Sequence, residues 1–430
     1  MKKILNTKWF TLSTYFLLLA AIMLVSFIFL QNNKTLNNVI TSFFEVAENR
    51  TFDYRQSIKI MHKQPVPNKD IVVLAIDDAS LEFLWDKYGE WPIPRNVYAD
   101  IVNYLEKDKP QAIIFDLLFI KPIRSEKSSD EMFTNTLNKY NNIYVGMNFD
   151  NVSSDVRLPE ELPARLSVEV ENSSKAEIYT FYNCRTILRD LLTGKVHVGM
   201  TNVFRNSDGI IRRVAPFIQY RNGYYPYLAF KAGSDYVADK EIKTYKIASN
   251  KSLKIQDLNI PLDKNGEAIL NWYGVSGTHT TYPMYKLVRD MTNSAGRERM
   301  NFKDKIVIIG TTAMALHDTK SVPIQEGVYP GVEVHATFFN NMLDNNFIKQ
   351  TDFKLNTILL LGLIGLVAII VMYSTSTIFA VLSTILFALA YLFTSYYVME
   401  LFNLWIPVVL PVVAITVAFA LTFIAKYLIK

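Results

Sequence analysis

The sequence predicts a membrane protein with one large α/β domain, whose sheet is mostly parallel with an antiparallel hairpin region, and four transmembrane helices. Half of the 430 residues are hydrophobic and 20% are charged. That balance is too apolar for an ordinary soluble protein and too charged for a chain that lies wholly in the membrane. Long uncharged runs lie near both ends of the chain, and the middle contains short apolar runs typical of buried parallel strands.

Four apolar runs are long enough to cross the hydrocarbon core of a bilayer. They are Trp9–Leu30, Leu355–Tyr373, Ile378–Val398 and Leu404–Ala425. A cleavable signal peptide is the alternative for the first run, but its apolar core would span only about 7–15 residues. The first run is longer than that, so we expect an uncleaved anchor.

Positively charged residues orient these predicted spans. Three lysines precede the first span, and Lys426 and Lys430 follow the last one. The positive-inside rule therefore places both ends of the chain in the cytoplasm. Residues 1–8 and 426–430 would be cytoplasmic tails, and residues 31–354 would form one extracytoplasmic domain.

Composition argues against several classes of function. Cys184 is the only cysteine, which excludes an intrachain disulfide and a cysteine-based zinc site. The net charge of +5 is small for this length and no dense basic run is present, so we expect no nucleic-acid partner. No phosphate loop, nucleophile elbow or two-histidine zinc helix is present, so we expect no cofactor and no metal. The dipeptide His317-Asp318 is similar to one in some metal phosphohydrolases, but the other histidines lack the matching spacing.

Apolar runs that end in aspartate or glycine predict the parallel strands. Ile71–Ile76 and Ala112–Phe115 are each followed by aspartate, and apolar residues at helical spacing lie between them. We therefore expect a βαβ unit. Ile143–Met147 and Lys305–Gly310 would add further strands, and a final helix is expected near Gly331–Leu343.

Turn signatures between other apolar segments predict the antiparallel region. An Asn-Ser-Asp-Gly turn separates Val196–Val203 from Ile210–Tyr220, and an Asp-Lys-Asn-Gly turn separates Leu258–Leu262 from Glu267–Trp272. Each pair of segments would form a hairpin. Residues 34–64 have mixed helical character and are expected to continue the first span outward as a stalk.

A set of short motifs is spread over about residues 49–343. The motifs are Ala75–Ser80, Trp91–Arg95, Phe115–Phe119, Asn202–Phe204, Asp208–Arg213, Tyr225-Pro226, Lys305–Ala313 and Pro330–Ala336. In this order and spacing they resemble the type-2 CHASE domain, an extracytoplasmic sensor module of bacterial signalling proteins. The arrangement of one span before the domain and three after it is also similar to that of the family, while the segment after Phe119 matches it less well.

The resemblance implies a receptor that ends in a cytoplasmic output domain, usually a nucleotide cyclase or histidine kinase. This sequence ends at Lys430, just past the fourth span, so the output domain would have been removed or would be a separate polypeptide. We expect a sensor, not an enzyme, in the bacterial cytoplasmic (inner) membrane. It would bind an unknown small ligand, form a homodimer and act on a cyclase or kinase effector. The alternative is a membrane-tethered scaffold, or an enzyme that uses Asp78 and Asp116.

Polar residues at the carboxyl ends of the predicted strands are the candidate ligand site, because open α/β sheets bind ligands there. Asp77, Asp78 and Asp116 follow two of the strands, and Thr311 and Thr312 follow a third. If a helix begins after these threonines, its first amide groups could hold an anion. Together with Arg95, these side chains could line one crevice. The carboxylates would suit a cation, whereas Arg95 and the glycine turn would suit an anion.

A structural role is the alternative for each of these residues. Asp78 and Ser80 could cap the next helix, and Asp116 could pair with Arg95. His335 falls on or beside the apolar face of the predicted final helix. A core or hydrogen-bonding histidine is the favoured interpretation there, and His335 stays a candidate ligand contact.

Overall fold

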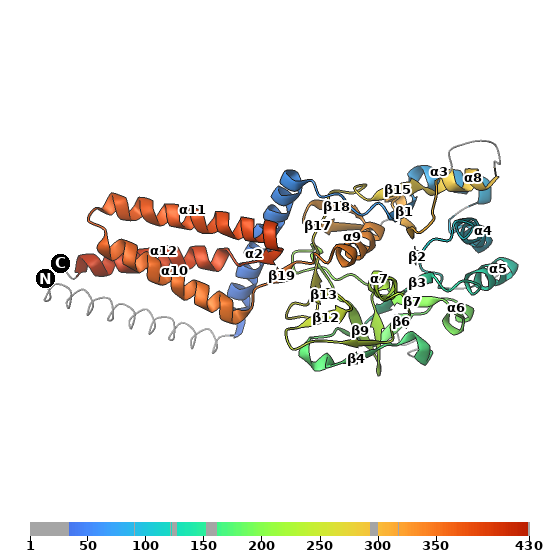
Figure 1. Cartoon of the computed structure of the whole chain (residues 1–430), viewed down its shortest axis with the longest axis horizontal. Helices are drawn as coiled ribbons and strands as arrows, with labels where there is room; N and C mark the ends of the chain where they lie inside the picture. Colours follow the sequence, from blue (N-terminus) through green and yellow to red (C-terminus); the bar gives the residue numbers. More distant parts are fainter. Residues whose placement is uncertain are drawn as a thin grey trace. The chain divides into compact units, whose positions relative to one another are not determined.

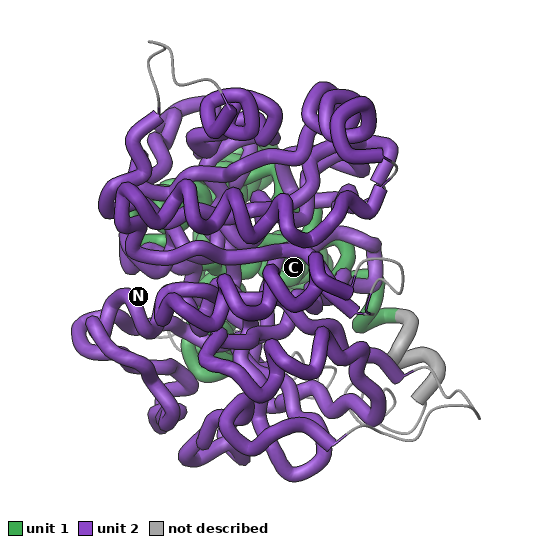
Figure 2. The backbone as a smooth tube through the Cα atoms, turned by 90° about the vertical axis from the view of Figure 1, so that its right-hand side faces the viewer, with its two compact units in different colours: residues 1–55, 350–430 green, residues 56–349 purple. Residues whose placement is uncertain are grey.

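The computed structural model describes residues 34–428, except residues 90, 121, 123–126, 152–160, 293–299 and 317. Contacts divide the chain into two units (Figure 2). One is a helical unit of Met1–Arg55 with Gln350–Lys430, and the other is an α/β unit of Gln56–Lys349. The first predicted span, Trp9–Leu30, lies outside the described residues.

A sheet with seven strands among the described residues forms the centre of the α/β unit (Figure 1). Its order is β15-β1-β16-β2-β3-β6, and β7 also pairs with β3. Strand β6 runs antiparallel to β3, and the other pairs are parallel. The strands are β1 (Ile71–Ile76), β2 (Ala112–Asp116), β3 (Ile143–Asp150), β6 (Asn183–Arg185), β7 (His197–Met200), β15 (Thr280–Pro283) and β16 (Ile306–Thr311).

Strand β16 lies between β1 and β2, which the sequence had predicted as a simple βαβ unit. Ile308 of β16 is paired with Val73 of β1 on one side and with Ile114 of β2 on the other. The apolar runs therefore identified the strands correctly but not their neighbours. Periodicity reports how a segment is buried and carries no information on which distant segment supplies its hydrogen bonds.

Helices cover both faces of the central strands. Successive side chains of a strand point to opposite faces. Ile308 packs in one cluster with Val332 and Phe339, and Ile309 belongs to the main core on the other face. Burial on both faces explains why these strands are continuously apolar. The first cluster includes residues of α7 (Leu228–Ala238) and α9 (Gly331–Asp344), and the main core includes residues of α3 (Asp78–Tyr88), α4 (Arg95–Leu105), α5 (Lys127–Leu137), α6 (Arg189–Thr193) and α8 (Met284–Thr292).

The predicted hairpins are both wrong, although both turns form. Gly209 N donates to Asn206 O at 2.8 Å, and Gly266 N donates to Asp263 O at 3.2 Å. The flanking segments pair elsewhere, because a turn motif specifies a local bend and does not choose the partners of the strands around it. Strand β7 pairs with β3, β9 with β10, β13 with β12, and β14 with β8.

Short strands complete the antiparallel region and the remaining edges of the unit. They are β4 (Glu169–Glu171), β5 (Thr180–Phe181), β8 (Arg213–Val214), β9 (Phe217–Tyr220), β10 (Gly223–Pro226), β11 (Thr244–Lys246), β12 (Ser252–Ile255), β13 (Leu258–Pro261), β14 (Ala268–Ile269), β17 (Thr319–Val322) and β18 (Gln325–Pro330).

The helical unit holds three described helices that are long and apolar enough to cross a membrane: α10 (Phe353–Tyr373), α11 (Thr377–Phe402) and α12 (Val409–Leu428). Residues 34–64, expected to be helical, form α2 (Lys34–Lys63), and its role as a stalk stays a prediction. The last span begins at Val409 and not at Leu404, because residues 404–405 form the short strand β20. Pro411 consequently lies in the first turn of α12, where a missing N–H leaves no helical hydrogen bond unmade.

Gly310, near the end of β16, allows α9 to approach the sheet closely. A Cβ atom built on Gly310 would lie 2.7 Å from both Cβ and Cγ2 of Val332. Val332 is buried in the first turn of α9, and its β-branched side chain has one strongly preferred rotamer in a helix.

We predict that Gly310→Ala lowers the free energy of unfolding of the full-length protein by about 1–3 kcal/mol through overpacking. Chemical unfolding should show that adding Val332→Ala recovers part of this loss, and a purely additive double variant would contradict this explanation.

A buried carboxylate gives the α/β unit a pH-dependent stability. Glu267 is 4% exposed, and its backbone N–H donates to Asp263, whose carboxylate pairs with Arg213 at 3.0 Å. Burial, followed by repulsion from Asp263, raises the pKa of Glu267 from 4.5 to about 7. The folded state therefore binds this proton more tightly than the unfolded chain, and the free energy of unfolding falls as the pH rises from about 4.5 to about 7.

We predict that Glu267→Gln removes this dependence. Relative to the wild type, the variant should gain about 2–3 kcal/mol of stability between pH 5 and pH 8. Chemical unfolding at the two pH values measures the difference, with the exposed Glu82→Gln as the matched control. A stability difference that stays the same at both pH values would show that Glu267 does not hold its proton in the folded state.

Candidate functional site

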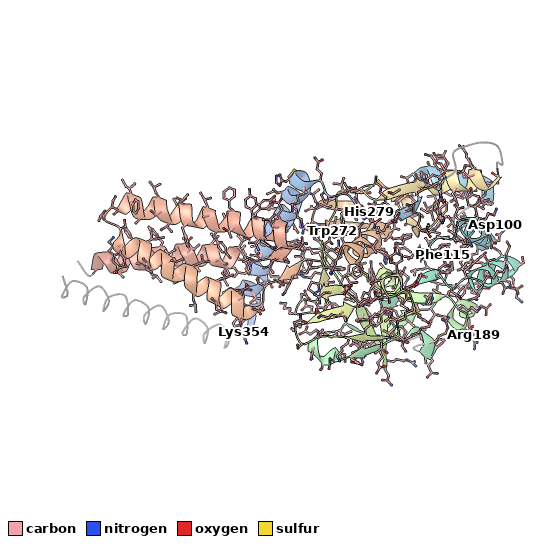
Figure 3. The ribbon with its side chains drawn as sticks, in the orientation of Figure 1. Asp100, Phe115, Arg189, Trp272, His279 and Lys354 are labelled. Carbon is pink, nitrogen blue, oxygen red and sulfur yellow. The ribbon has the colours of Figure 1, made fainter. Side chains whose placement is uncertain are left out.

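Asp116 and His335 meet at the carboxyl end of β2. His335 Nε2 lies 3.4 Å from Asp116 Oδ1. The imidazole is 1% exposed and stacks on the ring of Tyr227, with centroids 4.6 Å apart. Within the described part of the chain, His335 Nδ1 and Tyr227 Oη make no hydrogen bond. The predicted site residues Asp116 and His335 thus share one buried polar centre with unused hydrogen-bonding capacity. Figure 3 labels Phe115, the residue that precedes Asp116 in β2.

Asp318 brings a second carboxylate to Asp116. Lys320 Nζ lies 2.6 Å from Asp318 Oδ1. Burial, followed by repulsion from Asp116, raises the pKa of Asp318. The backbone of Gly331 donates to Asp318 O at 2.9 Å, and a Cβ on Gly331 would collide with the Asp318 carboxylate. The end of β2, the start of β17 and the first turn of α9 therefore form one carboxylate–imidazole cluster, which suits a cation or a hydrogen-bond donor.

The aspartates after β1 have local roles. Asp77 caps α3, and its Oδ1 accepts from Ser80 N at 2.7 Å. Ser80 is buried, and its hydroxyl donates to Ala75 O and accepts from Tyr285 N at 3.1 Å. The cap is thus Asp77, and not Asp78 or Ser80 as the structural alternative had proposed. Asp78 is the exposed first residue of α3, whereas Asp116 faces His335, so these two carboxylates have different surroundings.

Arg95 pairs with Asp130 of α5 and not with Asp116. Arg95 Nη1 lies 2.6 Å from Asp130 Oδ1, and both side chains are about 10% exposed. The guanidinium also lies 5.9 Å from the ring centroid of Phe119. The proposed pairing of Arg95 with Asp116 is therefore wrong, because α5 supplies a closer carboxylate that sequence spacing did not indicate.

Thr311 and Thr312 do not begin a helix that could hold an anion. Thr311 is a buried residue of β16. The N–H groups of Thr312 and Ala313 both donate to Ile76 O at 3.0 Å. A single 3₁₀ turn, Met314–Leu316, follows. The amide groups of Thr312 and Ala313 are therefore already hydrogen-bonded to the end of β1 and are not available to an anion.

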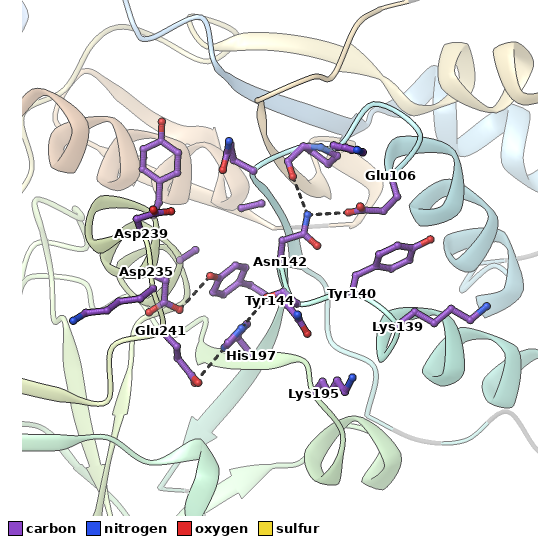
Figure 4. A pocket seen from close by; sticks show the side chains of 18 of the residues that line it. Glu106, Lys139, Tyr140, Asn142, Tyr144, Lys195, His197, Asp235, Asp239 and Glu241 are labelled. Carbon is purple, nitrogen blue, oxygen red and sulfur yellow. Dashed lines mark hydrogen bonds and ion pairs between the residues drawn. The ribbon is translucent and has the colours of Figure 1, made fainter.

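A second site, which the sequence reasoning missed, is a cavity of about 1270 Å³ (Figure 4). It lies at the amino ends of β2, β3 and β7, at the opposite strand ends from Asp116. Its lining is strongly polar and includes Glu106, Lys109, Lys139, Tyr140, Asn142, Tyr144, Arg165, Lys195, His197, Asp235, Asp239, Lys240, Glu241 and Lys243.

A hydrogen-bonded network forms the floor of this cavity. The rings of Tyr144 and His197 stack with centroids 4.8 Å apart, and Tyr144 Oη donates to Asp235 at 3.1 Å. Lys231 Nζ donates to the same carboxylate at 2.9 Å. His197 Nε2 lies 2.9 Å from Asn141 O, and since a carbonyl only accepts, Nε2 carries the proton. Burial, followed by the charge of Lys231, lowers the pKa of His197.

The sequence did not predict this cavity, because open α/β sheets are expected to bind ligands beyond the carboxyl ends of their strands, and the cavity lies at the amino ends. The available signal was the placement of polar residues shortly before two strands: Asn141 and Asn142 directly precede β3, and Lys195 lies two residues before the start of β7. Among the described residues, neither site groups three or more side chains that could hold a metal ion.

We predict that a double-mutant cycle detects an interaction between the side chains of Arg95 and Asp130. Arg95→Met alone should cost about 3–5 kcal/mol of folding free energy, because it removes one partner of a buried ion pair. The coupling energy between Arg95→Met and Asp130→Leu should be about 0.5–3 kcal/mol, whereas Arg95→Met and Asp116→Asn should be additive within about 0.5 kcal/mol. Chemical unfolding measures all variants. Strong coupling between Arg95 and Asp116 would contradict this pairing and indicate that Arg95 belongs to the strand-end cluster.

Comparison with protein families explains the ordered motifs. Residues 20–373 match the CHASE2 domain family. Neither the curated proteins nor the solved structures yielded a match. The family match covers most of the 430 residues and confirms the resemblance to the type-2 CHASE sensor domain. CHASE2 is an extracellular sensor domain and not a catalytic family. The chain therefore belongs to the CHASE2 domain family of membrane-associated signalling sensors.

Proposed function

We propose that the protein is a multi-pass sensor of the bacterial cytoplasmic membrane. Its α/β unit would face the extracytoplasmic side, bind a small ligand and act through the membrane helices on a cytoplasmic output domain. The CHASE2 match and the apolar helices α10, α11 and α12 support this proposal. Trp9–Leu30 would be the fourth span. The output domain, a cyclase or kinase, would be supplied by another chain or by sequence beyond this one.

The observation that carries the proposal is that α2 is one helix with residues in both units. Lys34–Arg55 belong to the helical unit, and Gln56–Lys63 belong to the α/β unit. Each part has its own buried polar anchor. Because an α-helix rises 1.5 Å per residue with its backbone hydrogen bonds satisfied internally, it transmits a shift or rotation along its length.

Lys59 anchors α2 within the α/β unit. Its Nζ donates to Asn271 Oδ1 at 2.9 Å, and both side chains are buried. Asn271 and Asn341 exchange two hydrogen bonds of 2.9 Å through backbone and side-chain atoms. Asn341 lies on α9, the helix that also contributes His335. Movement of α9 is therefore connected to Lys59 through a network of satisfied buried polar groups.

Glu48 and Arg55 anchor α2 within the helical unit. Glu48 Oε2 accepts from Val408 N and Val409 N at 2.7 and 2.9 Å, and Oε1 accepts from Trp405 Nε1 at 2.9 Å. The carboxylate thus caps the start of α12, where negative charge is favoured. Arg55 pairs with Glu48 at 2.9 Å and donates to Ser395 of α11 at 2.7 Å.

A ligand would change the signalling state by binding one arrangement of α2 better than another. The helical unit would read that arrangement at the amino end of α12 and along α11. A homodimer would give each set of helices a second set against which to move. Two packings of the same helices would then correspond to the two output states.

We predict that Lys59→Met alters hydrogen exchange at Val408 and Val409. Loss of the Lys59 anchor should loosen α2 and raise exchange at these two amides on the order of tenfold. The measurement is hydrogen exchange of the full-length protein in nanodiscs, with the exposed Lys69→Met as the matched control. An effect confined to the α/β unit would contradict transmission through α2.

Affinity purification of the tagged full-length protein from its native cells tests the output step. Mild detergent and mass spectrometry should recover a cyclase, a kinase or a similar effector with the wild type. The Glu48→Gln and Lys59→Met variants should change the activity of that effector, while Lys69→Met should not. An effector whose activity is the same in all variants would contradict the proposed signal path.

A further inference from the structure

Positive charge exceeds negative charge on the wall of the amino-end cavity. Of the four lining carboxylates, Asp235 pairs with Lys231 at 2.9 Å, Glu241 pairs with Lys243 at 2.6 Å, and Asp239 forms no ion pair within the described residues. The fourth carboxylate, Glu106, accepts a hydrogen bond from Asn142 at 2.8 Å, and burial raises its pKa. Within the described residues, five lining cations form no ion pair: Lys109, Lys139, Arg165, Lys195 and Lys240. The cavity therefore carries uncompensated positive charge.

The Asn138 side chain links the end of α5 to the loop before β7, next to two of these lysines in the sequence. Asn138 Oδ1 accepts from Lys195 N at 2.7 Å, and Asn138 Nδ2 donates to Asp190 O at 3.3 Å. A Cβ on Gly194 would collide with the Asn138 side chain, so the glycine allows this close contact. Lys139 directly follows Asn138 in the chain. Figure 4 shows the side chains of Lys139 and Lys195 on the wall opposite Asp235 and Asp239.

Arg165 fixes the loop that presents Lys195. Its Nη1 donates to Val196 O at 3.0 Å and its Nη2 donates to Leu191 O at 2.7 Å. These bonds lie on both sides of Lys195 in the sequence, and Arg165 adds a further positive charge to the cavity lining. An anion in the cavity would compensate this charge and gain charge-assisted hydrogen bonds.

We propose that this cavity binds a small organic anion that carries carboxylate or phosphate groups, and that Lys139 and Lys195 contribute positive charge to its binding. The volume of about 1270 Å³ is more than a single inorganic ion needs. Asn142 on the floor presents a side-chain amide beside the stacked Tyr144 and His197, and it is itself held by Glu106 at 2.8 Å. The positive charge would attract the anionic group, and the floor would contact the rest of the molecule. The idea that this anion is the signal of the sensor rests on the proposed function. The idea that the cavity binds an anion does not.

Isothermal titration of the full-length protein in phosphatidylcholine nanodiscs tests the site, with inorganic phosphate and succinate as probes at constant ionic strength. We expect saturable binding of at least one probe. Lys139→Gln with Lys195→Gln should weaken it by about tenfold or more. The control variant, Lys254→Gln with Lys303→Gln, removes the same charge from exposed positions outside the cavity and should leave the affinity unchanged.

The outcomes separate the ligand classes and the two proposals. Binding of phosphate alone identifies a phosphorylated ligand, and binding of succinate alone identifies a carboxylate. Absence of saturable binding for both probes, or equal weakening in both double variants, overturns the anion site. All lysines concerned are exposed, so the variants should unfold at the wild-type temperature. Binding that leaves hydrogen exchange at Val408 and Val409 unchanged would support the anion site and contradict the proposed function.

Discussion

The fold depends on the hydrogen-bond ladder that β16 makes with β1 on one side and β2 on the other. Without β16, two strands that are apolar on both faces would have unpaired inner edges, and such edges invite pairing with other chains. With it, the three strands form a double-sided core on which α7 and α9 pack from one side. Gly310 at the end of the same strand sets how closely α9 approaches. The Asp116–His335 contact depends on that position of α9. So does the link from Asn341 of α9 through Asn271 to Lys59 of α2.

Apolar periodicity was sufficient to predict the central strands, the final helix of the α/β unit and the three described membrane helices. Strand partners were not predictable, because the turns at Asn206–Gly209 and Asp263–Gly266 form while their flanks pair with other segments. The candidate site likewise contains residues that the sequence predicted and contacts that it did not. Asp116 was identified from its place at a strand end, but its contact with His335 joins residues far apart in the sequence. The amino-end cavity is built by loop residues without periodicity, which left only charge and proximity to strand starts as a signal.

Buried polar groups connect the elements that apolar packing alone would leave free to slide. Lys59 and Asn271 have one arrangement in which both are satisfied, as do Glu48, Arg55 and the first amide groups of α12. Such groups are costly when unpaired, so they favour a small number of discrete helix positions over a continuum. A sensor needs discrete positions, because a ligand shifts a population only between states that it binds with different affinities.

The late place of β16 in the sequence also governs how the protein is made. Strand β2 ends at Asp116 and β16 begins at Ile306, so roughly 190 residues must be synthesised before the core can close. At about 5–20 residues per second, that interval lasts roughly 10–40 s. During it, the growing chain has synthesised β1 and β2 but not the strand that pairs with their inner edges. Until the central strand arrives, these edges are open to pairing with other chains.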